Sequence, residues 1–424
     1  MDNNKLFEFI KRSTSAYQTV ETVRGMLTEA GYAELFESEL WSLENGKGYF
    51  VTRNGSSIIA FRYVEDARGF MIAASHSDCP SLRVKMSGEQ ISAYSRLDVE
   101  KYGGIINYSW LDRPLSVSGR VVLRDGDGMV SRGVDLDADI AVIPSVAIHM
   151  NRTVNDGVKF NLATDMLPLC GIGGERSLMP MIAEKLGVKE GDILSHDLFL
   201  YNREEPRLVG TRGELILAPR LDDLACAYTS TEAFISARPS ASVPVLAIFD
   251  NEEVCSATKQ GAASDFLRST LISVAGGSES CRRMLASSLM VSADNAHALH
   301  PNHPELSDKA NAPTLGGGVV IKFNASQRYA TDGISHGLFS LICERAGVKT
   351  QMYYNRADLP GGSTLGSISN TVVSLPTVDI GIAQLAMHSA TETAAIADVQ
   401  SMKKALGEFY SVSLIRVGDG FELN

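Results

Sequence analysis

Residues 243–249 form a short run, Val-Pro-Val-Leu-Ala-Ile-Phe, with no polar side chain, and four polar residues follow it at once. Such a run predicts a β-strand that is buried on both faces, as in a parallel sheet covered by helices. The polar residues Asp250, Asn251, Glu252 and Glu253 therefore stand where the strand should end. In open α/β sheets, ligands bind beyond the carboxyl ends of the strands. This stretch predicts an α/β fold with a functional site at that edge.

Glu252 and Glu253 are adjacent, and neighbouring side chains on an extended backbone point in opposite directions. One carboxylate could therefore bind a metal ion while the other faces a substrate water. A solvated acidic turn is the alternative interpretation of the same residues. The choice depends on whether other apolar runs of the chain end in matching ligands.

The composition excludes several classes of protein. With 44% hydrophobic and 21% charged side chains, the 424 residues have the make-up of a soluble globular protein. No apolar run approaches the ~18 residues of a membrane span, and the residues after Met1 lack the pattern of a signal peptide. A net charge of −11 without a basic stripe argues against nucleic acid as a partner. The six cysteines form no C-x-x-C pair, which predicts reduced thiols and a cytoplasmic protein.

The first part of the chain has an α/β pattern. Residues 3–31 carry helical periodicity, and Asn54-Gly55 between two apolar runs predicts a hairpin with a type I′ turn. After residue 214 the pattern returns, with a helix predicted from about residue 219 through Phe234. Further apolar runs occur at 69–74, 213–218, 285–292, 316–324 and 377–381, and further helices are predicted at 335–347 and 393–412.

The middle of the chain has a different pattern. Residues 116–123 alternate like a half-buried strand, and helical periodicity is sparse until Glu175–Leu186. This predicts a β-rich insertion with its own core. We therefore expect one domain made of residues 1–86 and 215–424, interrupted by a second domain at 87–214.

Five imidazole or carboxylate groups fall just beyond apolar runs of the α/β part. Five ligands are too few for two separate saturated sites, but they suffice for two metals that share a bridging carboxylate and keep open positions for water and substrate. The natural division places His76 and Asp294 on one metal, Glu253 and His388 on the other, and Asp222 between them.

Glu252 is then free to act as the general base that moves a proton from water to the leaving group. Asp78, two residues after His76, could hold the tautomer of that ring. Each ligand also has a plain interpretation: Asp222 could be the N-cap of the following helix, and a histidine near a strand end is usually structural.

Two further residues have plain interpretations from spacing alone. His149 lies within the β-rich insertion, where a core or interface histidine is the simplest interpretation. Lys322 follows a short strand, where a solvated lysine is expected.

Beyond these inferences from the residues, the chain resembles the aspartyl aminopeptidase family of dinuclear zinc exopeptidases over nearly its whole length. The resemblance rests on motifs that occur in the same order, at residues 76–85, 143–156, 220–226, 250–254, 292–297, 318–322, 327–331 and 384–389.

The resemblance implies a zinc-exopeptidase-like three-layer α/β catalytic domain with an inserted β-rich dimerisation domain, assembled into a tetrahedral homo-oligomer of twelve subunits. It implies the ligand set above, with Glu252 as general base and Asp78 supporting His76. His149 matches a family histidine that reaches the active site of a neighbouring subunit, which reverses its interpretation from spacing alone. Met387 matches a position that lines the substrate pocket, although a buried methionine is more often plain core.

The expected activity is removal of N-terminal residues, preferably Asp or Glu, from peptides with a free N-terminus. The expected cofactors are two zinc ions per subunit, and the ligands would also accommodate cobalt or manganese. An acidic substrate side chain needs a nearby cation, for which Lys322 is the first candidate and Arg83 the weaker one. Alternatives are a broader aminopeptidase, an amide deacylase, or an assembly protein whose active site has decayed.

Three positions depart from the family pattern. Cys255 stands where the family has glycine, so the loop must shift if that position needs a positive φ. Asp223 replaces asparagine and adds negative charge beside Asp222, and residues 357–361 deviate from the family sequence. None of the three removes an expected ligand.

Overall fold

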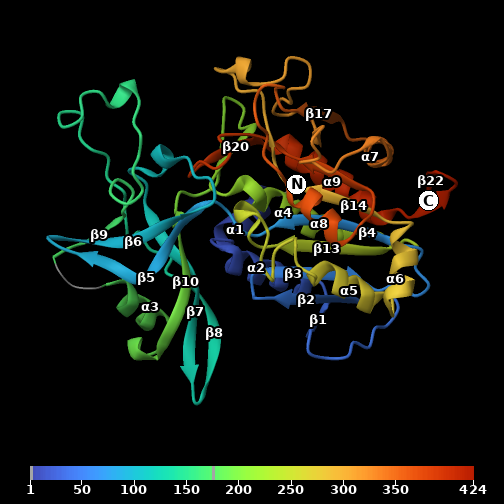
Figure 1. Cartoon of the computed structure of the whole chain (residues 1–424), viewed down its shortest axis with the longest axis horizontal. Coiled ribbons are helices and arrows are strands. Elements are labelled where there is room, and N and C mark those ends of the chain that lie inside the picture. The colour runs from blue at the N-terminus through green and yellow to red at the C-terminus, as the bar shows by residue number, and fades with distance from the viewer. Residues whose placement is uncertain (1–2, 174–176) are drawn as a thin grey trace.

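The computed structural model describes residues 3–173 and 177–424 of the chain. They form a larger α/β lobe and a β-rich lobe that stands beside it (Figure 1). Among the described residues, no helix is long and apolar enough to cross a bilayer.

The larger lobe is built on a mixed nine-stranded sheet in the order β1-β2-β3-β13-β4-β14-β18-β16-β17. The central strands β13, β4, β14 and β18 run parallel to one another. Their carboxyl ends therefore meet at one edge of the sheet. The strands are β1 (Ala33–Leu35), β2 (Gly48–Arg53), β3 (Ser57–Arg62), β4 (Phe70–His76), β13 (Val243–Phe249), β14 (Leu289–Ala293), β16 (Val319–Phe323), β17 (Thr350–Tyr354) and β18 (Thr377–Gly381).

Helices cover both faces of this sheet because its central strands are apolar on both sides. In β4, Phe70 and Ile72 pack into one hydrophobic cluster, whereas Met71 and Ala73 pack into the other. The predicted three-layer α/β architecture is confirmed. One face carries α1 (Asn3–Arg12), α2 (Ala16–Glu29), α4 (Leu221–Ser236), α7 (Gly333–Ala346) and α9 (Ile396–Ser411), and the other carries α5 (Phe266–Val274), α6 (Ser278–Leu285) and α8 (Leu365–Val372).

The β-rich lobe has a six-stranded sheet in the order β8-β7-β10-β5-β6-β9 and a hydrophobic core of its own. The sheet runs from Ser81 to Asn202, so β5 begins before residue 87. The predicted limits 87–214 and the role in dimerisation stay predictions. Its elements are β5 (Ser81–Ile91), β6 (Tyr94–Tyr102), β7 (Leu115–Asp125), β8 (Gly128–Asp135), β9 (Leu169–Ile172), β10 (Ile193–Asn202) and α3 (Leu178–Leu186).

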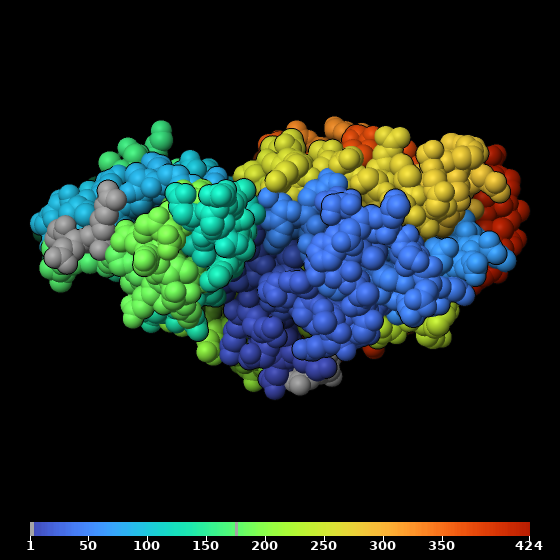
Figure 2. Space-filling view, turned by 90° about the horizontal axis from the view of Figure 1, so that it is seen from below, coloured from blue at the N-terminus to red at the C-terminus, as the bar shows by residue number. Residues whose placement is uncertain are grey.

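The β7–β8 hairpin lies beside the N-terminal part of the larger lobe (Figure 2), where β7 packs against α2. Gln18 donates a hydrogen bond to the carbonyl of Gly119, and Thr14 donates one to Asp135. These contacts fix the β-rich lobe at the side of the larger lobe.

A small five-stranded sheet connects the loops near the carboxyl edge of the large sheet. Its order is β11-β12-β20-β19-β15. It brings the chain that follows β14 beside the chain that precedes His388, because β15 pairs with β19. The strands are β11 (Arg207–Val209), β12 (Leu215–Ala218), β15 (Ala296–His297), β19 (Ala383–Leu385) and β20 (Glu392–Ala395), and the chain ends in the hairpin β21 (Leu414–Val417) and β22 (Gly420–Leu423).

Three local predictions can be compared with the structure. Residues 3–31 are not one helix, because the backbone is extended at Ser15 and separates α1 from α2. The Asn54-Gly55 hairpin is confirmed, and both residues have the positive φ that a type I′ turn needs. The predicted start of the helix at Glu175 lies outside the described residues, and α3 begins at Leu178.

Candidate metal centre

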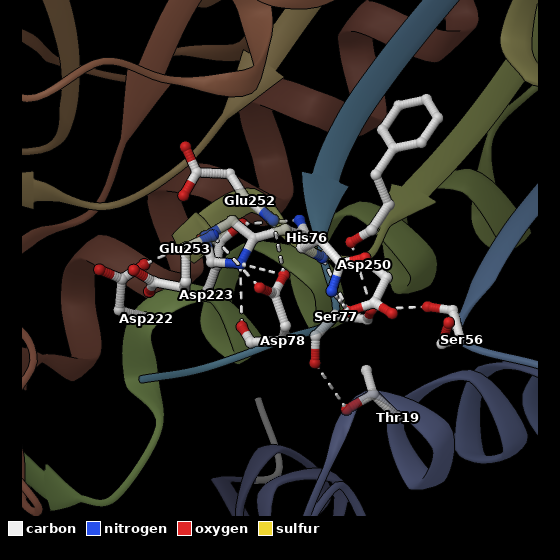
Figure 3. Close-up of polar contacts among 12 residues, drawn as sticks. Thr19, Ser56, His76, Ser77, Asp78, Asp222, Asp223, Asp250, Glu252 and Glu253 are labelled. Atoms are coloured by element: carbon white, nitrogen blue, oxygen red, sulfur yellow. Dashed lines mark hydrogen bonds and ion pairs between the residues drawn. The ribbon is translucent and has the colours of Figure 1, made fainter. Parts of the chain in front are cut away.

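Polar side chains from several loops meet at the carboxyl edge of the parallel strands (Figure 3). His76 is the last residue of β4, and Glu252 and Glu253 begin the 3-10 helix η4 (Glu252–Val254) that follows β13. Asp294 directly follows β14, and Asp222 lies at the start of α4. The predicted position of the site at this edge agrees with the geometry.

The ring of His76 is held in one tautomer. Its Nδ1 lies 2.9 Å from the carbonyl oxygen of Asp78, which can only accept, so Nδ1–H donates this hydrogen bond. The other ring nitrogen, Nε2, is left to face Asp222, whose Oδ1 lies 3.5 Å away. A neutral imidazole that presents Nε2 is the form that binds a metal ion.

Asp222 lies between two histidines. Its Oδ1 faces Nε2 of His76, and its Oδ2 lies 3.7 Å from Nε2 of His388. His388 Nε2 in turn lies 3.4 Å from Oε2 of Glu253. The backbone of Asp222 is not helical, and Arg220 occupies the N-cap position of α4. The interpretation of Asp222 as a helix cap is therefore wrong.

The ligand atoms form three overlapping groups, and Asp222 belongs to two of them. One group contains Asp222, Glu253 and His388, and in each group the ligand atoms all lie within 4.8 Å of one another. The structure thus brings together all five predicted ligands. The other groups are His76, Asp222, Asp223 and Asp294, and His76, Glu252 and Glu253.

The donor set fits divalent cations. Among the described residues, Asp222 Oδ1, Asp223 Oδ1 and Glu253 Oε1 are buried carboxylate oxygens without a hydrogen-bond partner. An isolated buried carboxylate is costly unless a cation or a donor compensates it. Imidazole nitrogens with carboxylate oxygens are ligands that zinc accepts. The cluster is therefore arranged to hold cations.

Electrostatics show the same need for positive charge. Burial and the neighbouring negative charges raise the pKa of Glu253 and Asp223 well above their ordinary values. Burial, opposed by His76, raises the pKa of Glu252 to about 8. Burial lowers the pKa of His76, but Asp223 and the other surrounding carboxylates together overcome it and raise that pKa. Without cations, the site therefore tends to keep protons on its carboxyl groups.

We expect the metal-free protein to lose stability as the pH rises from 4.5 towards about 8. The lower limit is the ordinary pKa of a glutamate, and the upper limit is the pKa of Glu252 in the folded protein. A carboxyl group with a raised folded-state pKa holds its proton longer in the folded state, so the free energy of unfolding falls as the pH rises through this interval. Zinc should reverse the loss. Thermal unfolding of chelator-treated protein across this pH range, with and without zinc, checks it, and a flat metal-free profile would contradict it.

Lys322 is not solvated, and the plain interpretation of this residue is wrong. Only 2% of its surface is exposed, and its Nζ lies 2.7 Å from the carbonyl of Asp294 and 3.3 Å from that of Asn295. Burial disfavours the ammonium, but Asp294 and further neighbouring acidic groups together overcome this and raise the pKa of Lys322. A permanent cation therefore lies beside one of the predicted ligands.

His149 and Met387 lie in different settings. His149 is exposed in the loop that follows Ile143, which projects from the β-rich lobe away from the large sheet (Figure 1). It belongs to none of the ligand groups found among the described residues. Met387 is half-buried beside His388.

Sequence reasoning missed a residue that connects the two halves of the cluster. Glu392 is buried, and its carboxylate accepts hydrogen bonds from the backbone N–H of Asp222 at 3.0 Å and of His388 at 2.7 Å. No spacing in the sequence signals this role, because Glu392 lies within the short strand β20.

Cys255 has a φ of +78°, so the position does adopt the left-handed conformation that glycine prefers. A side chain in this region costs roughly 1–2 kcal/mol. The loop nevertheless keeps Glu252 and Glu253 at the cluster. Asp223, the second departure, lies inside the cluster and accepts a hydrogen bond from the backbone N–H of His76 at 3.3 Å.

Comparison with known proteins agrees with this geometry. The family model described as aminopeptidase I zinc metalloprotease (M18) matches residues 9–410. A probable M18 family aminopeptidase 2 of Clostridium novyi is 40% identical over 428 residues, covering 96% of this chain and 98% of the relative.

Solved structures show the same fold. The cryo-EM structure of the Ape4 and Nbr1 complex matches with a TM-score of 0.92 and 33% identity, covering 96% of this chain and 85% of that chain. The mApe1 dodecamer of S. cerevisiae matches with a TM-score of 0.84 and 25% identity, covering 96% and 95%.

Proposed function

Because this chain belongs to the M18 family of aminopeptidase I zinc metalloproteases, we propose that it holds two divalent cations and preferentially removes N-terminal Asp or Glu from peptides. The observation that carries the proposal is the position of Asp222. Its two oxygens face His76 on one side and His388 on the other, so two groups of ligands share one carboxylate. A shared carboxylate is the arrangement of two-metal hydrolytic sites.

In the proposal, His76 and Asp294 would hold one cation, Glu253 and His388 would hold the other, and Asp222 would serve both. Asp223 lies close enough to the first group to add a further oxygen. Zinc is the first expectation, and the oxygen-rich first group would also accept manganese or cobalt. Bound cations would polarise the scissile carbonyl and lower the pKa of water.

The protein's own contribution to the chemistry is proton transfer by Glu252. Its backbone N–H donates to Oδ1 of Asp78 at 3.1 Å, which fixes the start of η4 beside the cluster. A carboxylate beside the cluster could take a proton from water and return it to the leaving amine. Asp78 therefore supports both Glu252 and His76, because its carboxylate accepts from the former and its backbone carbonyl holds the ring of the latter.

Lys322 supports the proposed preference for acidic residues. An acidic side chain that enters a site rich in carboxylates needs a cation that the ligands do not already neutralise. The ammonium of Lys322 donates to two backbone carbonyls and lies 3.4 Å from Oδ2 of Asp294, so a substrate carboxylate would share this cation with a predicted ligand. Met387 would line the same pocket. Arg83 is a weaker candidate because it pairs with Asp197.

Lys322→Met is expected to reduce kcat/KM on Asp- and Glu-peptides by about ten- to a hundredfold while sparing Ala- and Leu-peptides. A hydrogen bond to a charged group contributes roughly 1.5–3 kcal/mol, which corresponds to that factor. Steady-state kinetics on the four peptides measure the ratio, with the exposed Lys349→Met as control. Equal losses on both classes would show that Lys322 supports Asp294 and does not read the substrate.

The activity is tested on wild-type protein. Metal titration of the chelator-treated protein should saturate at two cations per subunit, and hydrolysis should require a free substrate amine. Cleavage of N-acylated peptides would identify an amide deacylase, and equal rates on acidic and neutral peptides would identify a broader aminopeptidase. Saturation at one cation would contradict the shared role of Asp222.

We further propose that the protein assembles into a homo-oligomer, in which His149 of one subunit completes the site of another. Its exposed loop, which includes Val146, Ile148 and Met150 as exposed apolar side chains, supports this proposal. The dodecamer of mApe1 supports an assembly of twelve subunits, for which we propose a tetrahedral arrangement. The six cysteines in the described part of the chain are all free thiols, which supports a cytoplasmic location.

A further inference from the structure

Residues 102–106 of the β-rich lobe, Tyr-Gly-Gly-Ile-Ile, lie against both halves of the ligand cluster. They begin at the last residue of β6 and lead into the 3-10 helix η1 (Asn107–Trp110), and we call them the strap. Sequence reasoning gave the strap no role, since it lies inside the segment predicted as a separate domain.

The strap holds His388 on one side. The carbonyl of Gly104 accepts the hydrogen bond of His388 Nδ1–H at 3.1 Å, and the backbone N–H of Ile106 donates to the carbonyl of His388 at 3.0 Å. The first bond fixes the tautomer, so that Nε2 faces Asp222 and Glu253. His388 needs this support because its φ is +67°, a conformation that costs a residue with a side chain.

The strap also holds the other half of the cluster through Asp78. The hydroxyl of Tyr102 donates to Oδ2 of Asp78 at 2.7 Å and accepts from the side chain of Asn251 at 2.9 Å. The same carboxylate accepts the N–H groups of Glu252 and Glu253 at 3.1 and 3.2 Å. Tyr102 thus fixes the side chain of Asp78. The carboxylate of Asp78 orients η4, and its backbone carbonyl holds the ring of His76.

The strap passes so close to Glu253 and His388 that glycine suits both positions, Gly103 and Gly104. A Cβ on Gly104 would lie 3.2 Å from Nδ1 of His388, which is closer than ordinary van der Waals contact. A Cβ on Gly103 would lie 3.2 Å from Cβ of Glu253, and its φ of +70° also disfavours a side chain. A side chain at either position would require the neighbouring predicted ligand to shift by a few tenths of an ångström.

We propose that the strap positions the metal ligands, with Tyr102 and Gly104 as positioning residues, so that both cation sites reach full affinity only when the β-rich lobe is seated on the larger lobe. The inference rests on the proposed two-cation function. It adds that residues of the β-rich lobe orient the metal ligands of the α/β lobe. Groups that hold metal ligands typically change metal affinity or activity by about 10–100-fold when they are replaced.

The test compares Gly104→Ala and Tyr102→Phe with two controls in the same lobe. Gly191→Ala adds a Cβ that meets nothing within 4 Å, and Tyr108→Phe removes a hydroxyl from a ring that is 69% exposed. Cobalt is titrated into each metal-free full-length protein, and its visible absorption reports the coordination of each site. Thermal unfolding of the metal-free proteins is recorded in parallel.

We expect Gly104→Ala to weaken one cobalt site by about 10–100-fold and to alter its spectrum, with the other site little changed. Tyr102→Phe should weaken cobalt binding through Asp78, and both controls should bind like wild type. Unchanged cobalt binding in both strap variants would overturn the proposal. So would metal-free unfolding temperatures far below those of the controls, because the strap would then support the fold. Wild-type protein that binds fewer than two cobalt ions would instead refute the proposed function.

Discussion

Glu252→Gln is expected to abolish peptide hydrolysis while the protein still binds two cations. Loss of a general base lowers the rate by about 10²–10⁴-fold or more. Glutamine keeps the size of the side chain and leaves the backbone N–H that donates to Asp78 in place. The measurements are kcat on an Asp-peptide and the metal content of the purified variant.

The matched contrast is His388→Ala, which should lose metal as well as activity. Its Nε2 faces both Asp222 and Glu253, so removal of the ring takes a ligand from one group. The contrast is needed because a group of His76, Glu252 and Glu253 also has the spacing of metal ligands. If Glu252→Gln also empties a site, Glu252 is a ligand and another group must act as the base.

Mixed oligomers are expected to recover activity from two inactive variants. His149 is exposed on a loop that projects from the β-rich lobe, outside the ligand groups of its own chain (Figure 1). If His149 acts in a neighbour's site, some sites in a mixed oligomer are intact. Such a site takes its Glu252 from a His149→Ala subunit and its His149 from a neighbouring Glu252→Gln subunit. Each variant alone should be nearly inactive.

The hybrid experiment needs proof of co-assembly. Differently tagged subunits are purified in tandem, so that only mixed oligomers are assayed, and each variant mixed with itself serves as the control. Activity in the hybrids well above both controls supports action between subunits. Hybrids as inactive as the parent variants would show that His149 acts within its own chain or has no role in the chemistry.

The sequence contained enough information for the sheet and the edge where the site lies. Apolar runs such as β4 and β13 predict strands buried on both faces, and the polar residues after them mark the carboxyl ends. Those features are local, so they can be read from a single sequence. Asp222 was harder, because an aspartate before a helix fits a metal ligand and a helix cap equally well, and only its two histidine partners separate the two roles.

Residues whose roles depend on distant partners could not be predicted. Glu392 holds Asp222, and Tyr102 holds Asp78, through contacts between segments far apart in the sequence. Spacing alone predicts a solvated Lys322, because a lysine at a strand end usually faces solvent, but the carbonyl of Asp294, just after β14, accepts a hydrogen bond from its ammonium. Such contacts follow from the packing of the lobes and leave no periodic signal in the sequence.

The order of the strands in the large sheet also has a consequence for how the chain folds. β4 pairs with β13 and β14, so Ala73 meets Leu246 and Val291, although the whole β-rich lobe is synthesised between these strands. Pairings between distant segments are slow to form, because a large loop must close before they stabilise the chain. During synthesis the β-rich lobe can therefore fold first, while β4 exposes two apolar faces. The centre of the molecule is completed late, and its exposed strand is the segment most in need of protection from aggregation until then.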